Sequence, residues 1–559
     1  MAAHHDHRYR LPYLSRRTLL RVAAAGGASA AALAVLSACG GGSSATTAPA
    51  VPAASAAGTS ASSAPVGGAV ATQGTTASGK QIDQFAVDLT SDAASLDPGT
   101  QYDTSSYSVY GNIFDTLLTR DPKTAEIKPF LATSYKIVND LTWELKLKDG
   151  IAFHNGEPFN ADAVKFSLER ILSSELKSPQ RANYALVDHV DVVDPQTVHI
   201  VTTQPFPTLS AYLTTHRVVP PKYTKEKGAD FLAANPVGTG PYKFVEWLKG
   251  DHVTLEANPH YWNGTPPVKK VIFRTVPENS TRIANLLSGH SDFIFSINPD
   301  DQQRVTGQPN LAVLVAPTER VAYLMMQTMD KFNSPTKNPK LREAISYAVD
   351  REGLLKALLQ GQGKLTDEML TPQHFGYDPA IAPYTYDPKK AKALMQEAGY
   401  GNGVKLAFLG SPGYAIGTLV NQALQDQLKQ IGIDLPITNL EFAAYLKKIQ
   451  NQDWQDIRFG QWSCSCLDAD GVINPLFNSQ SGWSSYSNPD LDKDLTAGRS
   501  TLDPTMRKQA YSRALKTLRD ASPGIPLWQV YATYGAKKTL RWQPTVDEQF
   551  YIMDMAFTG

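Results

Sequence analysis

The stretch that decides the fold begins with Asn235-Pro236-Val237-Gly238-Thr239-Gly240-Pro241-Tyr242. It continues through Phe244-Val245-Glu246-Trp247 to Asn258-Pro259-His260-Tyr261-Trp262-Asn263-Gly264. Gly238 and Gly240 predict a backbone turn that a β-carbon would forbid. No Lys-Ser or Lys-Thr pair follows these glycines, so the turn is not a phosphate-binding loop. Taken alone it could be any tight loop, and its meaning depends on the neighbouring segments.

Further motifs lie on both sides of this stretch in a fixed order. Upstream are Ser95–Pro98, Tyr110–Leu117, Phe153–Phe159 and Ala161–Arg170, and downstream are Leu341–Arg351, Tyr486–Asp490 and Pro523–Leu527. In this order the segments resemble the extracellular solute-binding protein family 5. That family contains the oligopeptide-, dipeptide- and nickel-binding proteins of ABC importers. The resemblance covers residues 82–559.

The resemblance implies an α/β fold, a two-lobed clamp of the type II periplasmic-binding-protein kind with an additional third domain. Such a clamp closes over a ligand between its lobes. By analogy, lobe I holds the discontinuous segments 81–118, 219–320 and 528–559. The additional domain is 119–218, and lobe II is 321–527.

Local patterns agree with a mixed α/β chain. Ile82–Leu89 alternates as a strand does, and Thr142–Leu147 predicts another strand. Asn160 is placed to cap a helix in which Val164, Leu168 and Ile171 form one apolar stripe. Pro339 predicts the start of a helix that runs to about Leu359. Two more helices are predicted where Asp precedes Pro, from Pro388 to Gly399 and from Pro504 to Leu518.

The resemblance also implies which segments line the ligand cleft. Similar proteins use the loop that holds Tyr102 and Asp103, the strand near Tyr323, and the strand that ends at Phe459–Ser465 with Trp462 in it. Tyrosine and tryptophan suit such a site because they combine apolar area with one polar group. The alternative, that these aromatic side chains only fill the core, stays open.

Ser465 departs from the pattern of peptide binders. In close peptide binders an aspartate at this position pairs with the α-ammonium group of the peptide. A neutral hydroxyl does not supply the charge-assisted bond that a desolvated ammonium needs. Asp468 or Asp470 could substitute for it. Arg458 lies one place from where a carboxylate-binding arginine would align, so the sequence gives it no role.

Cys464 and Cys466 form a Cys-x-Cys pair, and the chain has only one other cysteine, Cys39. A bridge between residues two apart is expected to be strained. A soft-metal site or a redox sensor is one alternative. With no neighbouring histidine or third cysteine, the favoured interpretation is a pair of buried free thiols.

Composition and motifs exclude several classes of protein. Of 559 residues, 53 are Lys or Arg and 53 are Asp or Glu, so no basic field favours nucleic-acid binding. No nucleophile elbow, zinc-protease helix, P-loop or dinucleotide fingerprint is present, so we expect no enzyme, no cofactor and no resident metal. The alternatives to a peptide or other organic solute are a metal chelate of the nickel or haem type, or a solute receptor for a signalling partner.

The N-terminus is predicted to be an export signal. Arg16 and Arg17 resemble the twin-arginine consensus, and the apolar run Val22–Leu36 spans about 22 Å, short of the roughly 30 Å hydrocarbon core. The run ends at Leu36-Ser37-Ala38-Cys39, which resembles a lipobox. Residues 1–38 are therefore predicted to be cleaved, which leaves a lipidated Cys39.

Residues 39–80 are predicted to be a flexible tether, because Gly40–Gly79 consists mainly of Gly, Ser, Thr, Ala and Pro and contains no charged residue. A lipid, a tether and a large body predict an exported monomer held at the outer face of a membrane. Its expected partners are the solute, the membrane through the lipid, and an ABC permease with its cytoplasmic ATPase.

Overall fold

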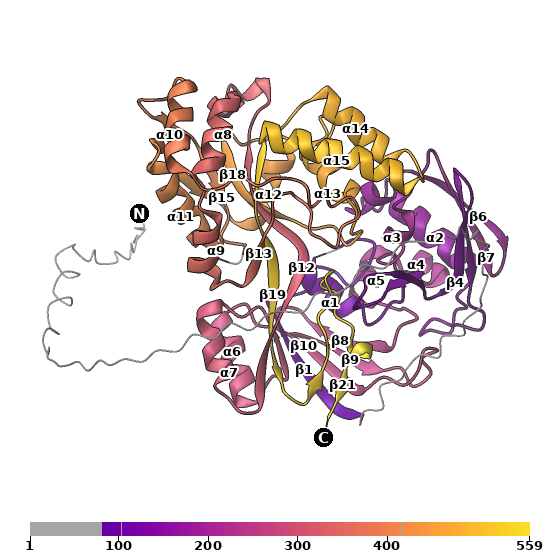
Figure 1. Cartoon of the computed structure of the whole chain (residues 1–559). Coiled ribbons are helices and arrows are strands. Elements are labelled where there is room, and N and C mark those ends of the chain that lie inside the picture. The colour runs from indigo at the N-terminus through magenta and orange to yellow at the C-terminus, as the bar shows by residue number, and fades with distance from the viewer. Residues whose placement is uncertain (1–80, 102, 415, 559) are drawn as a thin grey trace, which may run out of the picture. The chain divides into compact units, whose positions relative to one another are not determined.

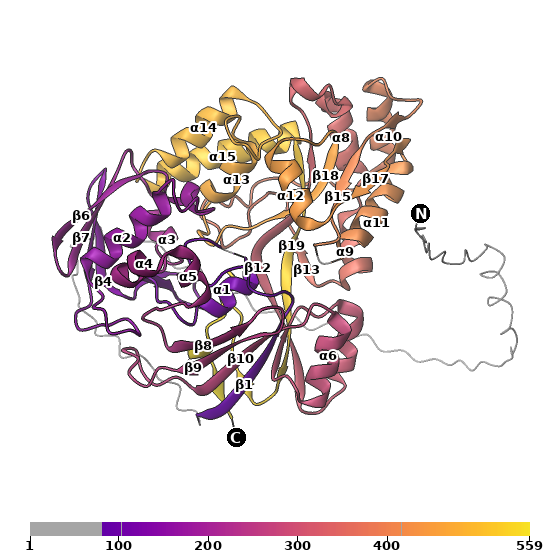
Figure 2. The same cartoon turned by 180° about the vertical axis from the view of Figure 1, so that it is seen from behind.

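The computed structural model describes residues 81–101, 103–414 and 416–558. The predictions for the signal sequence, for Arg16, Arg17, Cys39 and the tether, and for Tyr102, therefore lie outside the described residues. The described chain is a mixed α/β structure (Figures 1 and 2). This agrees with the predicted fold class.

An 11-stranded sheet runs through the described chain. Ten of its strands follow one another in the order β17 (Ile437–Asn439), β15 (Phe408–Gly410), β18 (Ile457–Trp462), β12 (Leu311–Met326), β19 (Gly524–Lys537), β11 (Phe293–Phe295), β1 (Ile82–Leu89), β10 (Val268–Thr275), β9 (His252–Ala257) and β8 (Tyr242–Leu248). β13 (Gly363–Leu365) pairs with β19 off this path.

The long strands β12 and β19 connect the two halves of this sheet (Figure 1). They pair antiparallel from Leu311 opposite Lys537 to Met325 opposite Gly524, and the register shifts between Pro317 and Val321. The lobe boundaries expected at 320/321 and 527/528 thus fall inside these two strands. A change of relative orientation between the halves would have to bend this strand pair.

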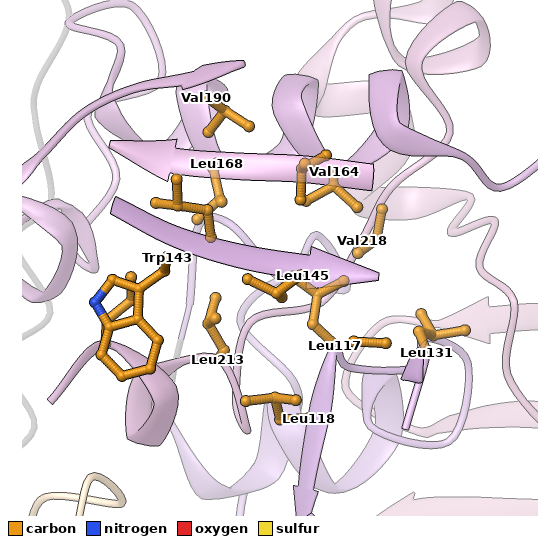
Figure 3. Packing of buried hydrophobic residues seen from close by; sticks show 14 of the residues in the cluster. Leu117, Leu118, Leu131, Trp143, Leu145, Val164, Leu168, Val190, Leu213 and Val218 are labelled. Atoms are coloured by element: carbon orange, nitrogen blue, oxygen red, sulfur yellow. The ribbon is translucent and has the colours of Figure 1, made fainter. Parts of the chain in front are cut away.

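A separate four-stranded antiparallel sheet lies within residues 119–218. Its order is β4 (Ala132–Asn139), β5 (Thr142–Leu147), β7 (Thr197–Thr202) and β6 (Val187–Asp194). Helix α2 (Ala161–Leu172) contributes Val164 and Leu168 to the core of this region, which is shown in Figure 3. Three two-stranded ribbons complete the strands: β2 (Leu118–Arg120) with β3 (Ile127–Pro129), β14 (Val404–Lys405) with β16 (Ile433–Asp434), and β20 (Leu540–Arg541) with β21 (Ala556–Phe557).

The remaining α-helices pack beside these sheets (Figures 1 and 2). They are α1 (Thr104–Tyr110), α3 (Leu209–Tyr212), α4 (Pro221–Lys227), α5 (Ala229–Ala234), α6 (Asn279–Ser288), α7 (Gln302–Thr306), α8 (Pro339–Ala348), α9 (Arg351–Leu359), α10 (Pro388–Glu397), α11 (Gly417–Lys429), α12 (Phe442–Gln450), α13 (Asp470–Phe477), α14 (Pro489–Arg499) and α15 (Pro504–Ala521).

Most of the predicted elements are confirmed. Asn160 caps α2 by accepting from the Ala163 amide, and Asp387 and Asp503 cap α10 and α15. The single helix predicted from Pro339 to Leu359 is wrong. Val349 is extended, and Asp350 caps a new helix, α9, by accepting from the Gly353 amide.

Gly238 and Gly240 are required for a different reason from the one predicted. Neither has a positive φ. Instead, both pass against the backbone of Ile113, whose carbonyl accepts from the Gly240 amide at 2.8 Å. A β-carbon at Gly238 would overlap that carbonyl oxygen, and one at Gly240 would lie 2.6 Å from it. The two glycines therefore let the loop before β8 pack on the segment after α1.

Candidate functional site

The site is built on one face of the β12–β18 strand pair. The strands are antiparallel, with Val321 opposite Trp462, Tyr323 opposite Gly460, and Met325 opposite Arg458. Because side chains alternate along a strand, these residues share one face. The intervening residues Ala322, Leu324 and Phe459 belong to the core packed against α8, α9 and α11. Val321, Tyr323 and Met325 belong to a second core with residues of α12, α13 and α15, and Tyr323 is 2% exposed.

Arg458 lies on the first of these faces and is 1% exposed. Its Nη1 donates to the hydroxyl of Tyr323 at 3.2 Å. Its guanidinium carbon lies 5.4 Å from the centre of the Tyr323 ring and 5.2 Å from the centre of the Trp454 ring. Nε and Nη2 are buried and have no hydrogen-bond partner among the described residues. No carboxylate of the described chain pairs with Arg458, so it is a buried cation without a counter-charge.

Glycine at 460 is what allows this arrangement. A β-carbon there would lie 2.8 Å from Arg458 Nη1 and 3.0 Å from the hydroxyl and nearest ring carbon of Tyr323. Tyr445, from α12, is fully buried beside the same strand and donates to the Phe459 carbonyl. The guanidinium is thus enclosed by aromatic side chains.

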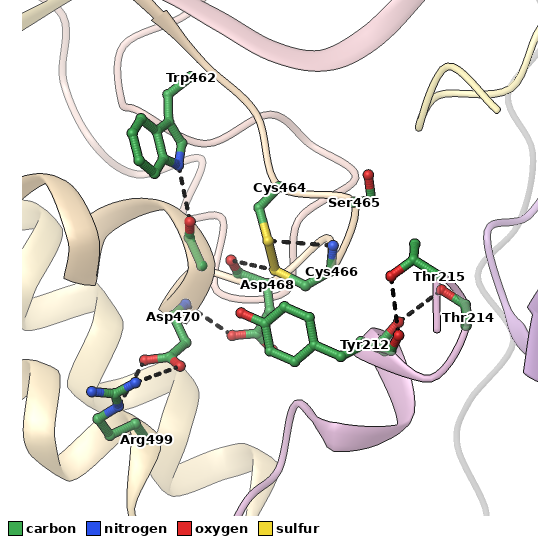
Figure 4. The surroundings of a disulfide bond; sticks show 12 residues. Tyr212, Thr214, Thr215, Trp462, Cys464, Ser465, Cys466, Asp468, Asp470 and Arg499 are labelled. Atoms are coloured by element: carbon green, nitrogen blue, oxygen red, sulfur yellow. Dashed lines mark hydrogen bonds and ion pairs between the residues drawn. A yellow bond between two sulfur atoms is a disulfide. The ribbon is translucent and has the colours of Figure 1, made fainter. Parts of the chain in front are cut away.

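Trp462 ends β18 and is half-buried. Its indole N–H donates to the Gly471 carbonyl at 2.9 Å (Figure 4). The centre of its ring lies 5.4 Å from that of Trp483, in an edge-on arrangement. Ser465 follows in the loop and is also half-buried, and Figure 4 shows its side chain pointing away from the sulfur atoms. The structure therefore places Tyr323, Trp462 and Ser465 along one strand pair and its loop.

Asp468 is a buried carboxylate whose charge is compensated. Arg507 Nη2 lies 2.7 Å from its Oδ1, which also accepts from the Asp470 amide at 2.9 Å. Burial raises the pKa of Asp468, and Arg507 opposes that shift. Asp470 is paired in turn, with Arg499 at 3.2 Å. A ligand ammonium would compete here with two arginines already present, and a binding role for Asp468 stays a prediction.

Asp103 is at the start of α1. One carboxylate oxygen caps that helix by accepting from the Ser106 amide at 2.9 Å, whereas Oδ2 is buried without a hydrogen-bond partner among the described residues. Asp103 thus has one buried oxygen that accepts no hydrogen bond from the described residues, and a binding role for Asp103 stays a prediction. Its predicted neighbour Tyr102 lies outside the described residues.

The prediction of free thiols at Cys464 and Cys466 is wrong. The two sulfur atoms form a disulfide, with the α-carbons 5.1 Å apart (Figure 4). Leu467, directly after the pair, adopts a positive φ of 51°. The Cys466 amide also donates to Cys464 Sγ at 3.3 Å.

Two cavities adjoin Arg120 of β2. One of about 280 Å³ is lined by Asp115, Asp547 and Tyr551 among others, all outside residues 321–527. The second, of about 410 Å³, lies between residues 120–126 and the segment 372–377. None of the predicted ligand residues that the structure describes lines either cavity. Asp115 accepts from Tyr261, Trp262 and Thr239, and burial raises its pKa to about 6.

Within residues 81–101, 103–414 and 416–558, no group of three or more His, Cys, Asp or Glu side chains is arranged to hold a metal ion. Over the same residues, every helix is too short or too polar to span a bilayer.

Comparison with known proteins identifies relatives with this architecture. The glutathione-binding protein GsiB of Salmonella typhi is 32% identical over 456 residues, which are 79% of this chain and 88% of that protein. The binding protein DppA of Helicobacter pylori, solved with the peptide STSA, has a TM-score of 0.76 and 26% identity over 86% of this chain and 98% of its own.

AgaA of Agrobacterium tumefaciens R10, solved with agropinic acid, has a TM-score of 0.75 and 26% identity over 85% of this chain and 99% of its own. The family model for bacterial extracellular solute-binding proteins, family 5 (middle), matches residues 126–484. The expected clamp of the type II periplasmic-binding-protein kind is thereby confirmed. The chain belongs to the extracellular solute-binding proteins of family 5, the solute-capturing components of ABC importers.

Proposed function

We propose that this protein captures a small organic solute that carries a carboxylate, of the peptide or peptide-like class, and delivers it to an ABC permease. Residues 81–118, 219–320 and 528–559 form lobe I, residues 321–527 form lobe II, and 119–218 is the additional domain. The solute lies between the lobes, against the face of β12 and β18 that carries Tyr323 and Trp462.

The observation that supports this substrate class is the uncompensated charge of Arg458. Taking a guanidinium out of water without a partner costs several kcal/mol. Arg507, which is also buried, shows the alternative, because it pairs with the carboxylate of Asp468. A ligand carboxylate bound to Arg458 would supply the missing charge and the acceptors for Nε and Nη2.

The relatives agree with a ligand of this kind. Glutathione, the peptide STSA and agropinic acid, named for the three relatives above, all carry carboxylates. The hydroxyl of Ser465 in place of an aspartate argues against an α-ammonium bound at that point. The free oxygen of Asp103 is where we expect a ligand donor instead.

A binding screen tests the proposal. Short peptides, glutathione, S-methylglutathione, opines and chelated nickel are added to the mature chain, and the melting temperature is followed. A ligand at a hundredfold excess over its Kd should add about 2.7 kcal/mol of stability. Each peptide acid is paired with its C-terminal amide, and only the acid should bind tightly. Equal binding of acids and amides, or conversion of the best hit into product, would contradict the proposal.

The export and anchoring of the protein are part of the same proposal. Arg16 and Arg17 direct export, cleavage leaves Cys39 as the N-terminus, and its lipid holds the chain at the outer face of a membrane through the tether 39–80. Cys39→Ser should move the protein from the membrane pellet to the soluble fraction. Replacing both arginines by lysine should leave the precursor in the cytoplasm. A Cys39→Ser protein that still pellets fully would refute the anchor.

A further inference from the structure

The disulfide in the loop after β18 presents its two sulfur atoms unequally. Cys464 is half-buried, whereas Cys466 is 4% exposed and packs with the hydrophobic core of residues 117–218. Cys464 is the more exposed residue of the pair, although it also packs against the hydrophobic core, so we expect a nucleophile from solvent to reach Cys464 Sγ first. Attack on that sulfur makes Cys466 the leaving group.

The surroundings of the pair favour a thiolate. Helix α13 begins at Asp470, and its second residue, Gly471, lies so close that a β-carbon there would overlap both sulfur atoms. The partial positive charge of a helix N-terminus favours a negative charge beside it. Arg120 adds a cation on the other side, because its Nη2 donates to the Cys466 carbonyl at 2.8 Å. The nearby carboxylates Asp468 and Asp470 are paired with Arg507 and Arg499.

The rest of the chain offers no competing thiol. Its only other cysteine is Cys39, in the N-terminal region. Once the bond opens, the released sulfur cannot pair with a new partner in residues 81–559. An incoming thiol must therefore come from another molecule, and removal of that thiol restores the original bond.

We propose that the Cys464–Cys466 disulfide is a thiol-exchange site for low-molecular-weight thiols outside the cytoplasm. The thiolate of the small thiol attacks Cys464 Sγ, and a new S–S bond forms there as the Cys464–Cys466 bond breaks. The electron pair leaves on Cys466 Sγ, which takes a proton from water. The number of disulfide bonds is unchanged, so the step needs no further oxidant or reductant.

Opening the bond has a structural consequence next to the solute site. Arg120 holds the carbonyls of Ser465 at 3.3 Å and of Cys466 at 2.8 Å, which ties β2 to this loop. The ring closed by the disulfide contains the Ser465 carbonyl, and the Cys466 carbonyl follows directly after that ring. When it opens, the loop 463–467 gains freedom, and amide hydrogen exchange should become faster there and in residues 118–130. The exchange chemistry itself does not depend on the proposed solute.

Mass spectrometry of the mature full chain tests the site. The oxidised protein is incubated with reduced glutathione, quenched with acid, treated with N-ethylmaleimide and digested. We expect glutathione attached to Cys464 and maleimide attached to Cys466. A bond that stays intact, or glutathione found mainly on Cys466, would overturn the proposal.

Two matched variants test the difference in exposure. Cys466→Ser leaves a free thiol at 464, and Cys464→Ser leaves one at 466. With oxidised glutathione, the thiol at 464 should be modified about tenfold faster or more, because Cys464 is the more exposed of the two residues. Equal rates, or a faster thiol at 466, would refute the assignment provided that circular dichroism shows both variants folded. Solute binding measured without any thiol reports separately on the proposed function.

Discussion

Arg458 and Arg507 are two buried arginines that should respond in opposite ways to the same substitution. Arg507 is 5% exposed and pairs with Asp468, so Arg507→Met leaves a buried carboxylate without its partner. The loss of one member of a buried pair costs about 3–5 kcal/mol. Arg458 has no such partner among the described residues. Arg458→Met removes a desolvated charge and two unsatisfied donors, and it keeps most of the apolar volume between Tyr323 and Trp454.

We therefore expect Arg458→Met to leave the free energy of unfolding of the empty protein unchanged or to raise it by up to about 2 kcal/mol. The same variant should weaken the best carboxylate ligand by about 10- to 100-fold, which corresponds to a charge-assisted hydrogen bond of about 1.5–3 kcal/mol. Thermal unfolding with and without ligand, and calorimetric titration, give both numbers. If Arg458→Met destabilises the empty protein as much as Arg507→Met does, Arg458 is a structural residue and the substrate argument fails.

Three other predictions concern single side chains. Burial raises the pKa of Glu368 to about 9, so the folded protein keeps this side chain neutral at pH values where the unfolded chain is already ionised. Between about pH 4.5 and 9 the free energy of unfolding of the wild type should therefore fall by about 1.4 kcal/mol per pH unit relative to that of Glu368→Gln. Melting temperatures that change with pH in the same way for the two proteins would disprove this. Gly238→Ala should lower the free energy of unfolding by about 1–3 kcal/mol, because the new β-carbon would overlap the Ile113 carbonyl. Gly482→Ala is the control: its β-carbon would lie 4.0 Å from the nearest atom, so the melting temperature should hardly change. Ser465→Asp should improve the binding of peptides with a free N-terminus over their N-acetylated forms by about 1–3 kcal/mol, and no change in that ratio would show that the ligand ammonium lies elsewhere.

Local sequence patterns predicted most of the secondary structure because caps and prolines act within one turn. Asn160, Asp387 and Asp503 each accept from amides two or three residues ahead, and each begins a helix where the sequence placed it. The break between α8 and α9 was missed because the apolar stripe runs on through it. Asp350 was the available signal, since it is a capping residue followed three positions later by Gly353.

The strand Ile82–Leu89 was predicted for a reason that holds only in part. Its last five residues, from Phe85 to Leu89, are all buried and do not alternate. β1 pairs in parallel with β10 and β11, and the burial of five consecutive residues means that side chains on both of its faces are covered, as is usual in parallel sheets. Neighbours on the two sides come from residues 268–275 and 293–295, and no pattern inside the strand itself contains that information.

The candidate site, too, depends on contacts between distant parts of the chain that local sequence patterns do not contain. That Tyr323 and Trp462 lie on one face follows from the pairing of β12 with β18, two strands more than a hundred residues apart in sequence. Whether a buried arginine is paired depends on every element around it, and sequence cannot distinguish Arg458 from Arg507. Their difference lies in Asp468, which pairs with Arg507 of α15, whereas no carboxylate of the described residues pairs with Arg458. Asp468 thus compensates one arginine, and the other has no counter-charge among the described residues, which is why we propose it as the site of a ligand carboxylate.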